Sequence, residues 1–178
     1  MATRARIALE LKDGSYISSY QHWDGYPGGL GYNLEEHWTD AKKVTEAIKL
    51  GNASKWGQII GEKIDFDGRD NPLYEVQNVY YGRDRGEQDQ GYHVYKDEAD
   101  YLDRGFNCGE EYVYLLKIDT DKKDYLGRPR GEWFYAKSTY TDEGKEVIGG
   151  FKPLEKDAIN DHIDMLKRHL QNMEKEAA

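Results

Sequence analysis

Apolar and charged side chains alternate near the N-terminus. Ile7, Leu9 and Leu11 share one phase, and charged residues occupy positions 6, 10 and 12. This period of two predicts a half-buried strand, and the Asp13-Gly14 dipeptide that follows is typical of a tight hairpin. A two-residue turn would place Leu11 opposite Tyr16, with Ile7 opposite Tyr20 and Ala5 opposite His22.

A helical period follows residues 22–31. Its apolar positions recur every three or four residues and are Leu34, Trp38, Ala41, Val44 and Ile48. Asn33 with Glu36 resembles a capping box, and Gly51-Asn52 is a typical C-terminal end. The pattern predicts one helix over 34–50, with the free N–H groups of its first turn available to an anionic ligand.

The later elements are shorter. Residues 52–91 read as irregular, with extended candidates at 59–60 and 76–81. Strands are predicted at 92–95, 112–118 and 133–137, with a short helix at 98–102. The nearly continuous apolar run at 112–118 predicts a central strand.

The last element is a long amphipathic helix that opens with Pro153 as its first residue. Its apolar positions alternate at spacings of four and three and are Ile159, Ile163, Leu166, Leu170 and Met173. Because two heptads are short for a coiled coil, we expect this helix to pack on the sheet, although the seam also permits a homo-oligomer.

Together these elements predict an α+β fold, with one domain over residues 1–178. Its antiparallel sheet carries a helix after the first hairpin and a long C-terminal helix. Hydrophobic residues make up 38% of the 178 positions, but 15 Tyr and 4 Trp supply large apolar area to a core.

Charge and cysteine content limit the classes of partner and the cellular compartment that we expect. The net charge of −9 argues against duplex nucleic acid and anionic membranes, which both require a basic face. The single Cys108 cannot form an internal disulfide, and no segment has the apolar length of a signal or a membrane span. These features predict a protein of a reducing cytoplasm, with Cys108 as a small buried side chain.

The segment 22–31 is the densest source of chemistry. His22, Trp23, Asp24 and Tyr26 stand among four glycines and Pro27. One interpretation is a pocket for a flat or sugar-like ligand, with His22 or Asp24 available for acid–base work. The alternative is structural: Asp24 caps a turn, His22 is a core residue, and Trp23 fills space beside Trp38.

A second candidate lies at 80–87, where Arg83 and Arg85 flank Asp84 between glycines. Their planar guanidinium groups suit a phosphate or carboxylate. The alternative is a charged turn whose arginines pair with neighbouring acids. We expect 22–31 and 80–87 to line one cleft, which would suit a nucleotide.

Other chemistries find no support in the sequence. The stretches 65–70 and 119–124 resemble the start of calcium loops but lack the glycine and glutamate that such loops need. No nucleophile elbow, phosphate-binding loop or dinucleotide fingerprint occurs. We therefore expect no metal, no cofactor and no catalytic machinery of a familiar kind.

Three segments together resemble a known group. These are the His22–Pro27 hexapeptide, the helix end Ile48-Lys49-Leu50-Gly51-Asn52, and Tyr81-Gly82-Arg83-Asp84-Arg85-Gly86-Glu87. They are similar to the "HWDGYP" accessory proteins of tailed bacteriophages, over about the first half of the chain. The resemblance implies a host-takeover or anti-defence factor in the host cytoplasm and carries no catalytic residue to transfer.

Three hypotheses follow for function. The first is a binding protein that holds a small anionic, nucleotide-derived ligand without turnover. Its site would consist of His22, Trp23, Asp24, Tyr26, Arg83 and Arg85. The second is an acidic inhibitor that binds a host or defence protein complex, and the third is an enzyme that acts on a nucleotide or sugar.

Overall fold

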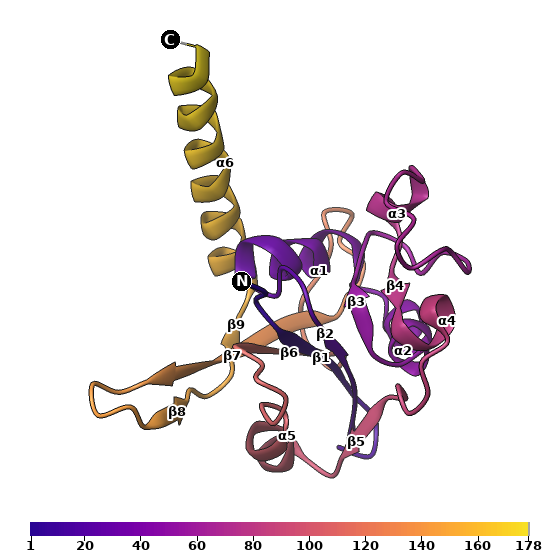
Figure 1. Cartoon of the computed structure of the whole chain (residues 1–178). Helices are drawn as coiled ribbons and strands as arrows, with labels where there is room; N and C mark the ends of the chain where they lie inside the picture. The colour runs from indigo at the N-terminus through magenta and orange to yellow at the C-terminus, as the bar shows by residue number, and fades with distance from the viewer. Residues whose placement is uncertain (178) are drawn as a thin grey trace.

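A mixed β-sheet forms the centre of the protein, as seen in a computed structural model that describes residues 1–177 (Figure 1). The strand order is β4-β3-β2-β1-β6-β7-β8, with β5 paired to β2 and β9 to β7. The strands are β1 (Ala5–Glu10), β2 (Tyr16–Gln21), β3 (Ala53–Lys55), β4 (Val79–Tyr80), β5 (His93–Tyr95), β6 (Tyr112–Lys117), β7 (Glu132–Tyr140), β8 (Glu146–Ile148) and β9 (Lys152–Pro153).

Helices pack on both faces of this sheet. They are the π-helical turn η1 (Pro27–Gly31), α1 (Tyr32–His37), α2 (Ala41–Lys49), α3 (Leu73–Val76), α4 (Tyr81–Arg85), α5 (Glu98–Arg104) and α6 (Glu155–Ala177). The α+β class is confirmed, but the sheet is not wholly antiparallel. The pairs β1–β6 and β2–β3 are parallel.

The turn of the first hairpin contains three residues, 12–14, so the two-residue prediction is wrong. The backbone of Leu11 pairs with that of Ser15, and Gly14 adopts a left-handed φ of +84°, which costs a glycine little. The extra residue shifts the register by one position, so that Leu9 faces Ile17 and Ala5 faces Gln21. Gln21, rather than His22, therefore lies on the apolar face.

Two hydrophobic cores sandwich the sheet. On one face α1, α2 and the start of α6 cover Ile7, Leu9, Tyr114 and Leu116, and on the other Tyr101 of α5 packs with the opposite face. Strand β6 contributes alternate residues to both cores and lies between β1 and β7. This arrangement confirms the central strand predicted from the apolar run.

The helix predicted at 34–50 is two helices, α1 and α2. Trp38 leaves the helical conformation, with φ −127° and ψ 47°, and buries its ring, while the Asp40 carboxylate accepts the Lys43 N–H and starts α2. Asn33 does not cap α1, because the chain is already helical from Pro27 onwards.

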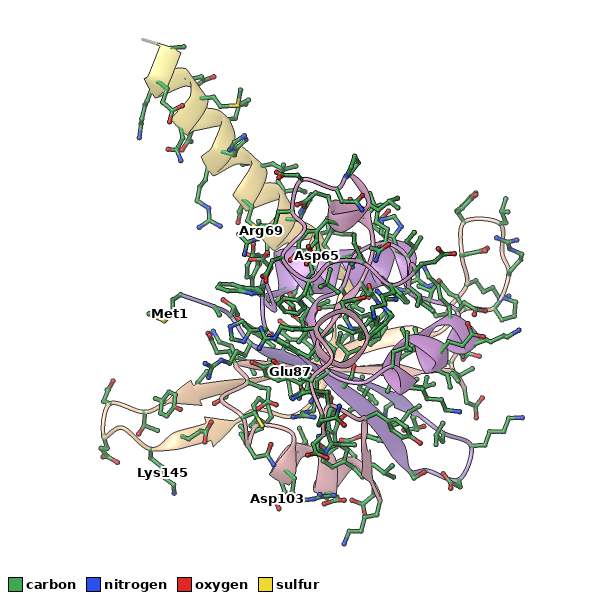
Figure 2. All side chains as sticks on the ribbon, turned by 45° about the vertical axis from the view of Figure 1, so that its right-hand side comes forward. Met1, Asp65, Arg69, Glu87, Asp103 and Lys145 are labelled. Atoms are coloured by element: carbon green, nitrogen blue, oxygen red, sulfur yellow. The ribbon has the colours of Figure 1, made fainter. Side chains whose placement is uncertain are left out.

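The long C-terminal helix is present, but the expected packing on the sheet is wrong. Pro153 lies in edge strand β9, where a missing N–H is tolerated, and α6 begins at Glu155. Only the first turns of α6 contact the body; the rest projects away from it (Figures 1 and 2). None of the helices formed by residues 1–177 combines the length and apolar character needed to cross a membrane.

The middle of the chain departs most from prediction. Residues 76–81 are not one extended segment: α3 ends at Val76, β4 spans two residues, and α4 begins at Tyr81. Residue 59 makes only an isolated bridge, with Gln77. The strands at 92–95 and 133–137 and the helix at 98–102 are confirmed, with bounds shifted by one to three residues.

Candidate functional site

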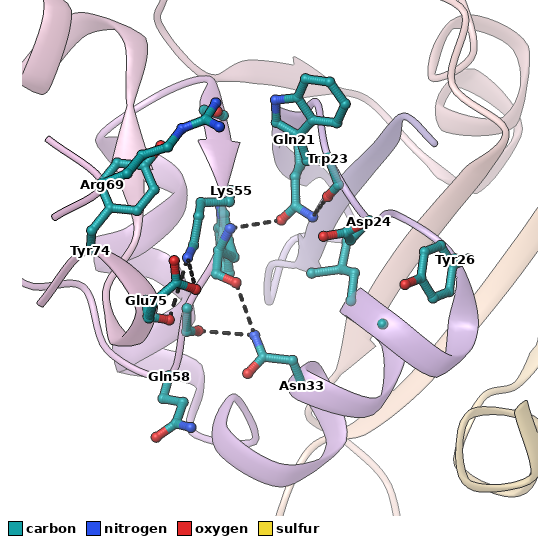
Figure 3. A pocket seen from close by; sticks show the side chains of 15 residues that line it. Gln21, Trp23, Asp24, Tyr26, Asn33, Lys55, Gln58, Arg69, Tyr74 and Glu75 are labelled. Atoms are coloured by element: carbon teal, nitrogen blue, oxygen red, sulfur yellow. Dashed lines mark hydrogen bonds and ion pairs between the residues drawn. The ribbon is translucent and has the colours of Figure 1, made fainter. Parts of the chain in front are cut away.

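A pocket of about 520 Å³ opens between the segment after β2, the η1–α1 helices, β3 and the α3 region (Figure 3). Its volume falls in the range of small-molecule sites. The lining residues are Gln21, Trp23, Asp24, Tyr26, Gly29, Leu30, Asn33, Ser54, Lys55, Trp56, Gly57, Gln58, Arg69, Tyr74 and Glu75. Trp23, Asp24 and Tyr26, three of the predicted site residues, therefore line one pocket.

Two amide side chains hold the walls together. The Gln21 side chain donates to the carbonyl of Trp23 at 2.5 Å and accepts the N–H of Trp56 at 3.0 Å. The Asn33 amide donates to the carbonyls of Trp56 and Gly57. Gln21 is 2% exposed, so its hydrogen bonds are shielded from water and keep the two walls in register.

Trp23 and Asp24 present their side chains to solvent at the pocket. Trp23 is 44% exposed, whereas Trp38 and Trp133 are fully buried and Trp56 is 5% exposed. The space beside Trp38 is filled by Trp56, with ring centroids 4.7 Å apart, which leaves Trp23 free. Asp24 has a φ of +56°, a region that Asp tolerates better than most residues but that still carries strain.

Two further predicted residues behave differently. His22 is absent from the lining; its Nδ1 lies 2.8 Å from the Tyr20 hydroxyl, and its ring packs edge-on against Trp23 at 4.8 Å. Burial and the nearby Arg4 charge lower the pKa of His22. His22 thus supports the Trp23 ring from behind. Tyr26 lines the pocket, and burial, followed by the Asp24 and Asp161 charges, raises the pKa of its hydroxyl.

The glycines of 22–31 serve packing. None of them has a positive φ. A Cβ on Gly25 would lie 2.6 Å from the Ala5 Cβ, and one on Gly28 would lie 2.7 Å from the Asp161 carboxylate. The Gly28 N–H donates to that same carboxylate at 2.7 Å. The anion predicted at the first turn of a helix from Leu34 has no free N–H groups to bind there, because the chain is already helical from Pro27; Asp161 of α6 instead accepts the N–H of Gly28, at the start of η1.

Arg83 and Arg85 lie outside the pocket, so 22–31 and 80–87 do not line one cleft. Arg83 pairs with Asp84 and donates to the carbonyls of Ile60, Gly61 and Asn78. These bonds fasten residues 60–61 and Asn78 to α4 and use the guanidinium completely.

Arg85 is also engaged by neighbours. It pairs with Glu87, and its guanidinium stacks over Phe66 and Tyr81. Both arginines therefore fit the interpretation of a charged turn: α4 places them next to acids and aromatic rings of the protein itself. The acids lie within 80–87 itself, whereas the carbonyls of Ile60 and Gly61 and the Phe66 ring come from a segment that the motif does not reveal.

The cationic groups at the pocket are Lys55 and Arg69, which the sequence did not single out. Lys55 forms a 3.5 Å ion pair with Glu75, whose side chain is 75% exposed, and lies over the Tyr74 ring. Such an exposed pair is weak. Arg69 is exposed, extends over Tyr74 towards the Trp23 side in Figure 3, and makes no side-chain ion pair or hydrogen bond within residues 1–177.

The sequence does not identify Lys55 or Arg69 as residues of the pocket. Arg69 belongs to the aspartate-rich stretch 65–70, which reads as a solvated turn, and Lys55 belongs to a three-residue strand without a clear period. Only the folding of the α3 region across β3 brings them to Trp23.

The remaining chemistry is sparse in the described part of the chain. No group of three or more His, Cys, Asp or Glu side chains there is arranged to hold a metal ion. Cys108 is exposed rather than buried, because the loop before β6 places it at the surface. Trp56, in the pocket wall, has a buried indole N–H without a hydrogen-bond partner.

Comparison with known proteins adds no relative. No protein-family model, curated protein or solved structure matches this chain.

Proposed function

We propose that the protein binds a small anionic ligand with a flat ring, of the nucleotide class, in the pocket bounded by Trp23, Lys55 and Arg69, and that it releases this ligand unchanged. The observation that carries the proposal is the presence, in one pocket of about 520 Å³, of a half-exposed indole and of a guanidinium that no side-chain bond engages within residues 1–177.

The ring of the ligand would stack on Trp23. The His22 ring already supports the indole edge-on, so the indole is held in place before binding, which lowers the entropy cost of stacking. Stacking of a base on an aromatic side chain contributes about 1–3 kcal/mol.

The anionic group would bind Arg69 and Lys55. Arg69 offers a planar fork suited to phosphate. On binding, Lys55 would give up its ion pair with Glu75 and pair with the ligand instead. Because the Glu75 side chain is exposed, loss of this ion pair costs little free energy. The exposed Asp24 carboxylate in the lining suits amino or hydroxyl groups of the same ligand.

Titration calorimetry with nucleoside phosphates and cyclic dinucleotides tests the proposal. We expect Trp23→Ala to weaken binding by about 5- to 150-fold, as the loss of 1–3 kcal/mol implies. Arg69→Gln should also weaken binding, whereas Trp23→Phe should retain most of it.

Arg85→Gln is the matched control, because it removes an equally charged side chain outside the pocket. Trp23 is the most exposed of the four tryptophans, so ligand stacking should quench a fluorescence component that Trp23→Phe lacks. Absence of heat and quenching across the panel, for folded protein, would rule out the proposal.

The resemblance to phage accessory proteins suggests a setting for such binding: removal of a nucleotide signal of host defence. Sequestration needs only tight binding and an unaltered ligand. Chromatography of the ligand recovered from the complex distinguishes this from the enzyme hypothesis, since recovered product in place of ligand would indicate turnover.

A further inference from the structure

Asp24 has a backbone conformation that few residues other than glycine adopt. Its φ is +56°, and within residues 1–177 Asp89 is the only other non-glycine residue with a positive φ. The surrounding chain fixes this conformation. The Asp24 carbonyl accepts the Leu30 N–H at 2.9 Å, and the next N–H, of Gly25, donates to the Thr3 carbonyl at 2.8 Å. Residues held in such strained conformations are concentrated at binding and catalytic sites.

The left-handed φ brings two neighbouring side chains to one pocket. In an extended chain the side chains of consecutive residues point to opposite faces, yet Trp23 and Asp24 both line the pocket. The Asp24 carboxylate is exposed and forms no hydrogen bond or ion pair within residues 1–177. It therefore makes none of the bonds by which an aspartate stabilises a turn, and both of its oxygens can accept hydrogen bonds from a ligand.

The pocket separates its anionic group from its cations. In Figure 3 Lys55 and Arg69 lie on the left of the pocket, and Asp24 lies on the right, below the Trp23 ring. A nucleotide whose phosphate binds the two cations and whose base stacks on Trp23 would point the far edge of that base towards Asp24. This far edge is the Watson–Crick edge, because it lies opposite the bond to the sugar.

We propose that Asp24 accepts two N–H groups of a guanine base, so that the pocket prefers guanine nucleotides; this inference rests on the proposed binding of a nucleotide there. The Watson–Crick edge of guanine presents two neighbouring donors, the ring N–H and the 2-amino group, which match the two oxygens of a carboxylate.

The other bases do not offer this pair of donors. In adenine and cytosine the amino group lies beside a ring nitrogen that is an acceptor and repels a carboxylate. Uracil has one N–H between two carbonyl oxygens, which repel it as well. Because hydrogen bonds to an ionised acceptor are stronger than neutral ones, Asp24 should select the base rather than only tolerate it.

Calorimetry with matched pairs of ligands tests the choice of base. Guanosine and adenosine monophosphate carry the same phosphate group, as do cyclic di-GMP and cyclic di-AMP. We expect the guanine member to bind at least about 5-fold more tightly, the lower end of what a bidentate contact gives, because Asp24 is exposed to water. Inosine monophosphate, which lacks the 2-amino group, should bind with intermediate affinity.

The possible outcomes separate this inference from the proposed function. Equal or tighter binding of the adenine members would overturn the guanine preference and leave nucleotide binding in place. Absence of binding for every member of the panel would overturn both.

Asp24→Asn tests the residue. Asn tolerates the left-handed conformation, but its amide presents a donor beside an acceptor in place of two acceptors. It should weaken binding of guanosine monophosphate by at least about 5-fold and strengthen binding of adenosine monophosphate, whose edge is complementary to an amide.

The matched control is Asp89→Asn, because Asp89 is exposed, has the same left-handed φ and does not line the pocket. It should keep the wild-type ratio of the two affinities. Far-UV circular dichroism verifies that both variants are folded, and the wild-type comparison decides by itself if Asp24→Asn is not. An unchanged ratio in folded Asp24→Asn, or an equal change in both variants, would refute the role of Asp24.

Discussion

Glu35 is a buried carboxylate on α1 that joins three segments. It is 6% exposed and pairs with Arg130, while Lys122 and Glu155 lie close enough to affect its charge. Burial outweighs the attraction of Arg130 and raises the pKa of Glu35 to about 7, from an ordinary 4.5. The ion pair therefore reduces the cost of burying this carboxylate without removing it.

Glu35 should make the stability of the protein depend on pH near neutrality. A carboxyl group whose pKa is raised by folding stabilises the folded state. This contribution is complete at pH values below the pKa of the unfolded state, and it disappears as the pH rises through the pKa of the folded state. Relative to Glu35→Gln, wild type should lose about 3 kcal/mol between pH 4.5 and about pH 7 to 8.

Urea unfolding of both proteins across that pH range measures this difference. Glu36→Gln, an exposed neighbour on the same helix, is the control and should parallel wild type. A constant difference between wild type and Glu35→Gln would contradict the assigned ionisation.

At the scale of elements, the break between α1 and α2 shows that tertiary contacts can end a helix even where the helical spacing of apolar residues continues. The apolar spacing over 34–50 continues through Trp38 without a break. The Trp38 indole N–H donates to the Gly57 carbonyl at 2.8 Å, and its own carbonyl accepts the Trp133 indole N–H. These bonds to distant residues hold Trp38 outside the helix, and Asp40 then starts α2 anew.

Removal of the Asp40 cap should destabilise α2. Asp40→Ala loses the 2.8 Å bond to the Lys43 N–H and should cost about 1 kcal/mol, whereas Asp40→Asn should cost a few tenths. Thermal or urea unfolding measures both. Equal stability of the alanine and asparagine variants would show that the cap contributes nothing.

Elements with strong local signals were predictable, and short elements were not. The first hairpin, β6 and α6 follow from period and turn residues. Strands β3, β4 and β9 span two or three residues, which is too short for a period to appear. Of the candidate site, Trp23, Asp24 and Tyr26 were identifiable from composition, whereas Lys55 and Arg69 depend on how the α3 region folds back.

At the scale of the whole molecule, η1 connects the pocket to α6. Gly28 contacts α6 through its N–H and also through its carbonyl, which lies 3.0 Å from the His162 Nδ1. The adjacent Gly29 and Leu30 line the pocket. Helix α6 and the pocket thus share one short segment.

Gly28→Ala should loosen this junction. The added Cβ would lie within 2.8 Å of the Asp161 backbone and the His162 nitrogen, so α6 must move, at a cost of about 1–3 kcal/mol. Gly91→Ala, with open space around the added atom, should have little effect. Thermal unfolding and the rate of proteolysis within α6 measure the difference; identical behaviour of the two variants would contradict the tight contact.

The sequence by itself determined the α+β class, the central strand and the amphipathic C-terminal helix, because each is encoded by a period that a few neighbouring residues complete. Only the tertiary structure decided which cations face Trp23 and which side of α6 packs on the body. Arg83 and Arg69 look equally available in the sequence; their roles separate because carbonyls and a carboxylate from several segments surround Arg83, and none in the described residues binds the Arg69 side chain.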